Sequence, residues 1–138
     1  MATSEPEAGP LRLLLLDDHV AARQALVRRL VGETRLVVAG ATADVSEAAA
    51  LAGRHGPHVI LIDPRRQDGG GIAAIATLAA IELPAPPLIA AHASYYDAEQ
   101  WVRAQAAGAH DWILKQFDVD ALLHRLEWGL ERRRNPGG

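Results

Sequence analysis

The sequence predicts an α/β protein in which helices cover both faces of a parallel sheet. Short apolar runs bounded by turn residues alternate strictly with longer segments of helical spacing. The chain has 138 residues, the size of one domain built around a single core. Strands and helices that alternate in this way pack as a parallel sheet with right-handed crossovers.

The predicted strands are short apolar runs, and five of them occur along the chain. They are residues 11–16, 36–40, 58–62, 87–91 and 112–114. The first run, "LRLLLL", and the third, "HVILI", are the most continuously apolar, which is typical of strands buried on both faces. We therefore expect these two strands at the centre of the sheet.

The predicted helices fill the intervals between the strands and follow the last one. They are residues 20–31, 44–56, 71–83, 97–107 and 118–133. In the first helix, one apolar face is formed by Ala22, Leu26, Val27 and Leu30, and the last helix carries a similar stripe at Leu122, Leu123, Leu126 and Leu130. The second helix begins at Asp44, a predicted N-cap, with Glu47 three residues later, and it ends on Gly56.

The chain is expected to divide into a leader at 1–10, one domain at 11–133 and a linker or tail at 134–138. The leader has no apolar segment of the kind that a signal peptide needs, and no apolar run approaches the roughly 20 residues of a membrane span. We therefore expect a cytoplasmic protein. A net charge of −3 argues against direct nucleic-acid binding, and the absence of cysteine excludes disulfides and thiolate metal sites.

Polar residues follow four of the five predicted strands. Asp17 and Asp18 follow the first strand, Asp63 the third, His92 with Ser94 the fourth, and Lys115 the fifth. In open parallel sheets, ligands bind beyond the carboxyl ends of the strands. Three neighbouring carboxylates repel one another unless a cation is bound, and an all-oxygen donor set suits Mg²⁺. The sequence thus predicts a magnesium site, with a lysine that can pair with Asp63 or with a phosphoryl group.

These residues, in this order, resemble the receiver domain of two-component response regulators. The stretches "DDHVAARQALVRRL" and "GAHDWILK" are similar to the first and last motifs of that family, and the likeness runs from about residue 11 to 130. The resemblance implies a doubly wound, flavodoxin-like fold with strand order 2-1-3-4-5. It also implies a phosphorylation-controlled switch rather than a turnover enzyme.

The resemblance further implies a role for each residue of the site. Asp63 would accept the phosphoryl group from a histidine kinase, and Lys115 would neutralise the phosphoryl oxygens. Asp18, Asp63 and the backbone carbonyl of Arg65 would bind Mg²⁺ directly, with Asp17 acting through water. Arg65 and Ser94 would tune the lifetime of the phosphoryl group.

Three positions depart from the family pattern. His92 stands where the family has Ser or Thr, with Ser94 offering the nearest hydroxyl, and Trp112 stands at the switch position that usually holds Tyr or Phe. Gln116 replaces the proline that usually follows the lysine, which puts the cis peptide expected there in doubt. The phosphorylation site is thus complete, whereas the usual route of activation is in question.

Other interpretations of the same residues remain open. The acid pair could be helix-capping residues, and Asp63 a turn residue. The domain could be a pseudo-receiver that is never phosphorylated and serves as a docking or dimerisation module. A small phosphatase of the haloacid dehalogenase type would need a second acid where Arg65 stands. We expect His19 to cap or flank the first helix, and His55, His58, His110 and His124 to be surface residues.

The expected partners follow from the resemblance. They are a sensor histidine kinase or a phosphotransfer protein, and a second copy bound through the face made by the fourth helix, the last strand and the fifth helix. The last helix resembles one that runs on into an output domain, which would lie beyond this sequence. We expect at least one of Trp101, Trp112 and Trp128 to be buried.

Overall fold

The computed structural model describes residues 9–134, so most of the predicted leader and tail lies outside the described residues. Its strands are β1 (Leu11–Leu16), β2 (Leu36–Thr42), β3 (Val59–Ile62), β4 (Leu88–Ala93) and β5 (Asp111–Leu114). Its helices are α1 (Val20–Leu30), α2 (Val45–His55), α3 (Gly71–Ala79), α4 (Ala98–Ala107) and α5 (Val119–Arg134). All strand pairs are parallel in the order β2-β1-β3-β4-β5, which confirms the predicted fold.

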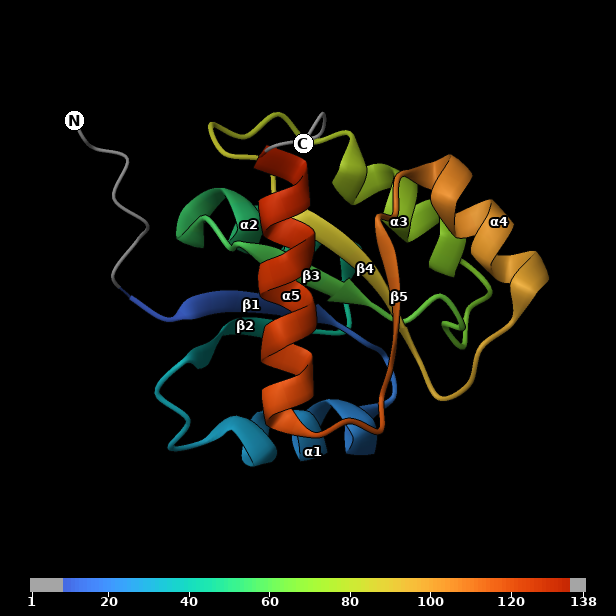
Figure 1. Cartoon of the computed structure of the whole chain (residues 1–138). Coiled ribbons are helices and arrows are strands. Elements are labelled where there is room, and N and C mark those ends of the chain that lie inside the picture. The colour runs from blue at the N-terminus through green and yellow to red at the C-terminus, as the bar shows by residue number, and fades with distance from the viewer. Residues whose placement is uncertain (1–8, 135–138) are drawn as a thin grey trace.

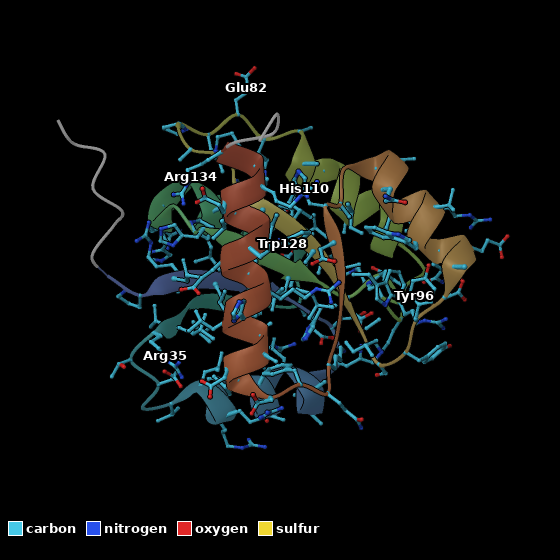
Figure 2. All side chains as sticks on the ribbon, viewed as in Figure 1. Arg35, Glu82, Tyr96, His110, Trp128 and Arg134 are labelled. Carbon is cyan, nitrogen blue, oxygen red and sulfur yellow. The ribbon has the colours of Figure 1, made fainter. Side chains whose placement is uncertain are left out.

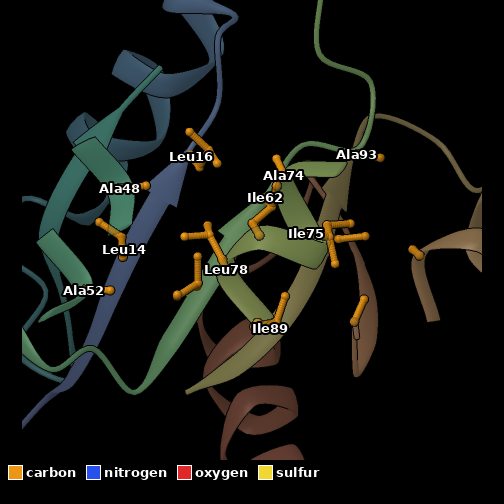
Figure 3. Packing of buried hydrophobic residues seen from close by; sticks show 14 of the residues in the cluster. Leu14, Leu16, Ala48, Ala52, Ile62, Ala74, Ile75, Leu78, Ile89 and Ala93 are labelled. Carbon is orange, nitrogen blue, oxygen red and sulfur yellow. The ribbon is translucent and has the colours of Figure 1, made fainter. Parts of the chain in front are cut away.

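The helices form one layer on each side of the sheet (Figure 1). Alternate leucines of β1 point to opposite faces, as the two-residue period of a strand requires. Leu13 and Leu15 pack with residues of α1 and α5, whereas Leu14 and Leu16 pack with residues of α2 and α3. Figure 3 shows the second of these clusters, in which small alanines of α2 let that helix approach the sheet closely.

Local sequence signals set most of the element boundaries. The Asp44 carboxylate caps α2 by accepting from the Ser46 amide at 3.0 Å, and Gly56 ends this helix with a φ of 56°. Three predicted ends were wrong by two residues or more, one of them in β2, which continues to Thr42 instead of ending at residue 40. The third helix ends at Ala79 rather than at residue 83, ahead of a proline-rich segment, and β4 continues to Ala93. His92 therefore lies within β4 and not after it.

Two histidines extend the sheet at the amino ends of its strands. The His58 amide donates to the Arg12 carbonyl at 2.9 Å, and the Arg12 amide donates back to His58 Nδ1 at 2.9 Å. The His110 and Ile89 pair repeats this arrangement, with distances of 2.7 and 3.0 Å (Figure 2 labels His110). Each ring thus replaces a backbone carbonyl as an acceptor. Among residues 9–134, no helix is long and apolar enough to cross a membrane.

Candidate functional site

Backbone hydrogen bonds hold three of the predicted site residues one position beyond the strands. The Asp17 amide donates to the Thr42 carbonyl at 3.0 Å, and the Asp63 amide donates to the Leu16 carbonyl at 3.1 Å. The Lys115 amide donates to the Ala93 carbonyl at 2.8 Å. The sheet register therefore fixes these side chains at one edge, which we call the carboxyl edge.

Lys115 is the centre of the site. Its Nζ donates to Asp17 Oδ2 and to Asp63 Oδ2, both at 2.7 Å. The side chains are 15%, 8% and 4% exposed, respectively, so the three charges are largely removed from water. Burial alone would raise the pKa of the Asp17 carboxyl, but its bonds with Lys115 and the His19 amide bring this pKa below the ordinary value. Burial likewise opposes the charge of Lys115, yet the two carboxylates raise its pKa. Both partners are thus held in their charged forms.

Asp18 lies beside this pair and provides the clearest opening for a cation. Its Oδ2 accepts from the Gln67 amide at 2.8 Å, whereas its Oδ1 is buried and finds no hydrogen-bond partner among the described residues. Ligand atoms of Asp17, Asp18 and His19 lie within 4.8 Å of one another. Carboxylates with an unsatisfied oxygen fit a hard divalent cation such as Mg²⁺, so this part of the site suits the predicted metal.

His19 flanks α1, as expected, but its side chain lies among the carboxylates of the site. It occupies the N-cap position with extended backbone, but its side chain makes no capping bond. Instead, its Nδ1 lies 3.0 Å from Asp17 Oδ1, 3.5 Å from Asp18 Oδ1 and 3.1 Å from Asp63 Oδ2. The ring therefore fills the space among the three carboxylates. The sequence analysis missed this role, although the position directly after the acid pair was an available signal.

The loop between β3 and α3 wraps around Asp63. The Arg65 amide donates to Asp63 Oδ1 at 2.7 Å, so both oxygens of this carboxylate have a donor. A side chain at Gly71 would place its Cβ 2.0 Å from the Pro64 carbonyl oxygen, which only glycine avoids. The first residue of α3 thus lets this loop close against the site.

His92 stands over the site as a buried, neutral side chain. It is 5% exposed, and within residues 9–134 its Nε2 has no hydrogen-bond partner. Burial, and after it the charge of Lys115, lowers the pKa of the imidazole to about 4, although the Asp17 and Asp63 carboxylates act in the opposite direction. At neutral pH the residue therefore adds no positive charge to the site.

The predicted switch residues occupy very different surroundings. Trp112 is 6% exposed and packs edge-on against the rings of Tyr96 and Trp101, at centroid distances of 5.6 and 6.2 Å. Ser94 is exposed on the loop after β4, and Trp128 on α5 is 58% exposed. The expectation that at least one tryptophan is buried is thus confirmed by Trp112. Among residues 9–134 no peptide bond is cis, including the one at Gln116.

Comparison with known proteins identifies a family over most of this chain. The model of the response regulator receiver domain matches residues 13–127. The transcriptional regulatory protein PdtaR of Mycobacterium tuberculosis is 30% identical over 132 residues, which are 96% of this chain and 62% of PdtaR. The transcriptional regulatory protein DegU of Brevibacillus brevis is 27% identical over 85% of this chain and 49% of its own length. The chain thus spans about half to three fifths of these relatives.

Solved structures agree with this result. The receiver domain of the response regulator NarL from M. tuberculosis has a TM-score of 0.71 and 26% identity, covering 86% of this chain and 98% of that one. A response regulator from Thermotoga maritima has a TM-score of 0.71 at 22% identity, covering 88% and 98%, and so shares the fold. The family match over residues 13–127, on a sheet with these acids and this lysine at its carboxyl edge, places the chain among the response regulator receiver domains of two-component signal transduction.

Proposed function

We propose that this receiver domain accepts a phosphoryl group on Asp63 from a phosphohistidine of a sensor histidine kinase or phosphotransfer protein. The observation that carries the proposal is the position of Lys115 Nζ, 2.7 Å from both Asp17 and Asp63. Phosphoryl transfer depends mainly on positioning and charge neutralisation, and a buried ammonium bound to the acceptor carboxylate provides both.

The transfer forms one bond and breaks another. An Asp63 oxygen attacks phosphorus, the phosphorus–nitrogen bond of the donor breaks, and its electron pair returns to the donor imidazole. The product is an acyl phosphate carrying roughly −2 of charge. Lys115 then balances the phosphoryl oxygens, and the Arg65 amide, which lies 2.7 Å from Asp63 Oδ1, can donate to the same group.

The site residues that would hold Mg²⁺ are Asp18, Asp63 and the Arg65 carbonyl, with Asp17 acting through water. The bound ion would screen the charge of the phosphoryl oxygens during transfer. The unpartnered Oδ1 of Asp18 supports this assignment. The His19 ring lies among the same carboxylates, so we expect it to turn away when the ion binds.

The remaining parts of the proposal concern partners. The relatives are longer than this chain, so an output domain beyond its C-terminus is proposed, with the whole protein acting in the cytoplasm.

A second copy is proposed to bind the face of α4, β5 and α5. Val102, Leu114 and Trp128 are 65%, 41% and 58% exposed there, and a groove of about 930 Å³ runs between β5 and α5. Size-exclusion chromatography with light scattering, before and after phosphorylation, tests this dimer.

A second candidate is a docking module that is never phosphorylated. The buried, neutral His92 and the tightly packed Trp112 favour it, because neither matches the family's usual switch residue. The phosphatase alternative is not retained, since a receiver domain is a signalling module rather than a turnover enzyme.

Intact-mass spectrometry after incubation with acetyl phosphate and Mg²⁺ distinguishes the two candidates. We expect one phosphoryl adduct on the native chain, none on Asp63→Ala, and one on Asp120→Ala, which removes an exposed carboxylate from α5 as a matched control. Mg²⁺ should also raise the melting temperature of the native chain more than that of Asp18→Asn. The absence of both an adduct and a Mg²⁺-dependent shift would favour the docking module.

A further inference from the structure

The side chain of Arg65 connects the loop after β3 with the loop before α4. Its Nη2 donates to Asp97 Oδ2 at 3.1 Å, and its Cζ lies 4.0 Å from the centroid of the Tyr95 ring. Arg65 and Asp97 are 32 residues apart in sequence, so this bond ties two loops that are distant along the chain. The amide of the same residue is bonded to Asp63. Arg65 therefore contacts the proposed phosphoryl acceptor with its backbone and the α4 loop with its side chain.

Asp97 links this contact to helix α4. Its Oδ1 accepts from the Gln100 amide at 3.0 Å, which makes Asp97 the N-cap of the helix. The neighbouring Tyr96 packs edge-on against Trp112 and is labelled in Figure 2. A change in the charge that faces Asp97 thus acts on the first turn of α4 and on the loop that leads into it.

The guanidinium is only partly satisfied by these contacts. Its Nε is buried without a hydrogen-bond partner, and the Arg65 and Asp97 side chains are 31% and 33% exposed. Asp97 contributes one carboxylate to the pair, whereas a phosphoryl group carries about −2 of charge on three acceptor oxygens. Guanidinium groups bind such oxygens through two parallel hydrogen bonds. A phosphoryl group two residues away would therefore compete strongly with Asp97 for Arg65.

The two side chains at the family's usual switch positions, His92 and Trp112, are buried and cannot move without repacking their surroundings. His92 has no hydroxyl to offer, and its ring is buried inside the strand. Trp112 lies between Tyr96 and Trp101 with its indole nitrogen buried. Arg65, in contrast, is partly exposed on a loop and can change partner without repacking the core.

We infer that Arg65 carries the phosphorylation signal to α4 by moving its guanidinium from Asp97 and Tyr95 to the phosphoryl group on Asp63. This inference rests on the proposed function. No covalent bond of Arg65 changes, and the capping bond between Asp97 and Gln100 remains. The loop of residues 94–97 and the first turn of α4 lose their tie to the loop after β3, so this exposed segment becomes freer to move and to fit a partner.

Hydrogen–deuterium exchange over residues 94–101 tests this inference on the full chain, with Mg²⁺ and beryllofluoride as the phosphoryl mimic. We expect beryllofluoride to raise the exchange of these amides about fivefold in the native chain, the effect of losing one partly exposed ion pair. Asp97→Asn, which keeps the cap but loses the charge, should show this increase without the mimic. Arg65→Gln should show it as well, with no further increase on adding the mimic.

Arg66→Gln is the matched control, because it removes a neighbouring arginine that pairs with Asp68 on the same loop. It should respond to beryllofluoride as the native chain does. Unchanged exchange in the native chain, in spite of a phosphoryl adduct on Asp63 by mass, would overturn the inference and leave the proposed function intact. The absence of any adduct would overturn both. Melting temperatures of all variants identify any that fail to fold, and the two variants at either end of the ion pair test it independently.

Discussion

The two edges of the sheet differ in how their polar side chains are satisfied. At the amino edge, His58 and His110 each accept a backbone amide from the neighbouring strand, so their rings complete the hydrogen-bond ladder. At the carboxyl edge and in the segments around it, several buried polar atoms have no hydrogen-bond partner among residues 9–134. They are Asp18 Oδ1, Arg65 Nε, Arg66 Nη1, His92 Nε2 and Gln100 Oε1, with Trp112 Nε1 close by in β5.

The polar groups at the amino edge stabilise the sheet, whereas those at the carboxyl edge leave hydrogen-bonding capacity for a ligand. A buried polar group costs about 1–3 kcal/mol when no protein group, water or ligand meets it. Two of these atoms belong to residues of the proposed site: Asp18 Oδ1, which a cation could meet, and Arg65 Nε, which a phosphoryl group could meet. At the amino edge, the rings of His58 and His110 complete the ladder and so add to the stability of the fold. Three predictions test this contrast.

The largest effect is expected for Lys115→Gln. The substitution leaves Asp17 and Asp63, which are almost fully buried, without the charge that neutralises them. Breaking a buried ion pair from one side costs about 3–5 kcal/mol, and urea unfolding at pH 7 measures this loss. Adding Asp63→Asn to the same chain should restore part of it, because one of the two unpaired charges is then removed.

Arg125→Gln is the control for that experiment. Arg125 binds Asp111 through two bonds of 2.8 and 2.7 Å, but it is 54% exposed. Its loss should cost less than about 1 kcal/mol, as for other surface ion pairs. Equal losses for the two variants would show that the carboxyl edge is no more dependent on its ion pair than the surface is.

A smaller loss of stability is expected when the pH is lowered, because His92 is buried in its neutral form. Burial lowers the pKa of this imidazole from 6.5 to about 4 in the folded chain. Between these values the unfolded chain binds the proton and the folded chain does not, so stability falls as the pH falls below about 6.5. The loss between pH 7.5 and 5 is about 2 kcal/mol.

Measuring the free energy of unfolding against pH for the native chain and for His92→Thr isolates the contribution of His92. Burial and the charge of Arg133 also lower the pKa of His110, so every variant loses some stability in acid. The difference between the native chain and His92→Thr should nevertheless change by about 2 kcal/mol over this range. His124→Gln, which removes an exposed histidine, should follow the native profile. Parallel profiles for the native chain and His92→Thr would contradict a buried neutral imidazole at the site.

The sequence was sufficient for features that depend on local pattern. Apolar runs located all five strands, and the acids and lysine after them marked the carboxyl edge. It was insufficient wherever a side chain reaches another strand or loop. Three such contacts depend on the register of the sheet and on side-chain rotamers, which the sequence does not show. They are the position of His19 among three carboxylates, the bond from Arg65 to Asp97 and the bonds that two histidines accept from backbone amides. The roles assigned to Asp63, Lys115 and the switch residues stay predictions until phosphorylation is measured.

The smallest effect is expected at the amino edge, for His110. In His110→Leu the Ile89 amide loses its acceptor, which should cost about 1 kcal/mol because the position is exposed and water replaces part of the bond. In His110→Asn the side-chain oxygen can take the place of Nδ1, so the loss should stay within about 0.5 kcal/mol. Urea unfolding at pH 7.5 measures both variants. If His110→Asn were as destabilising as His110→Leu, the ring would act by packing rather than by accepting a hydrogen bond from the Ile89 amide. The amino edge would then no longer differ from the carboxyl edge in the way its polar groups are satisfied.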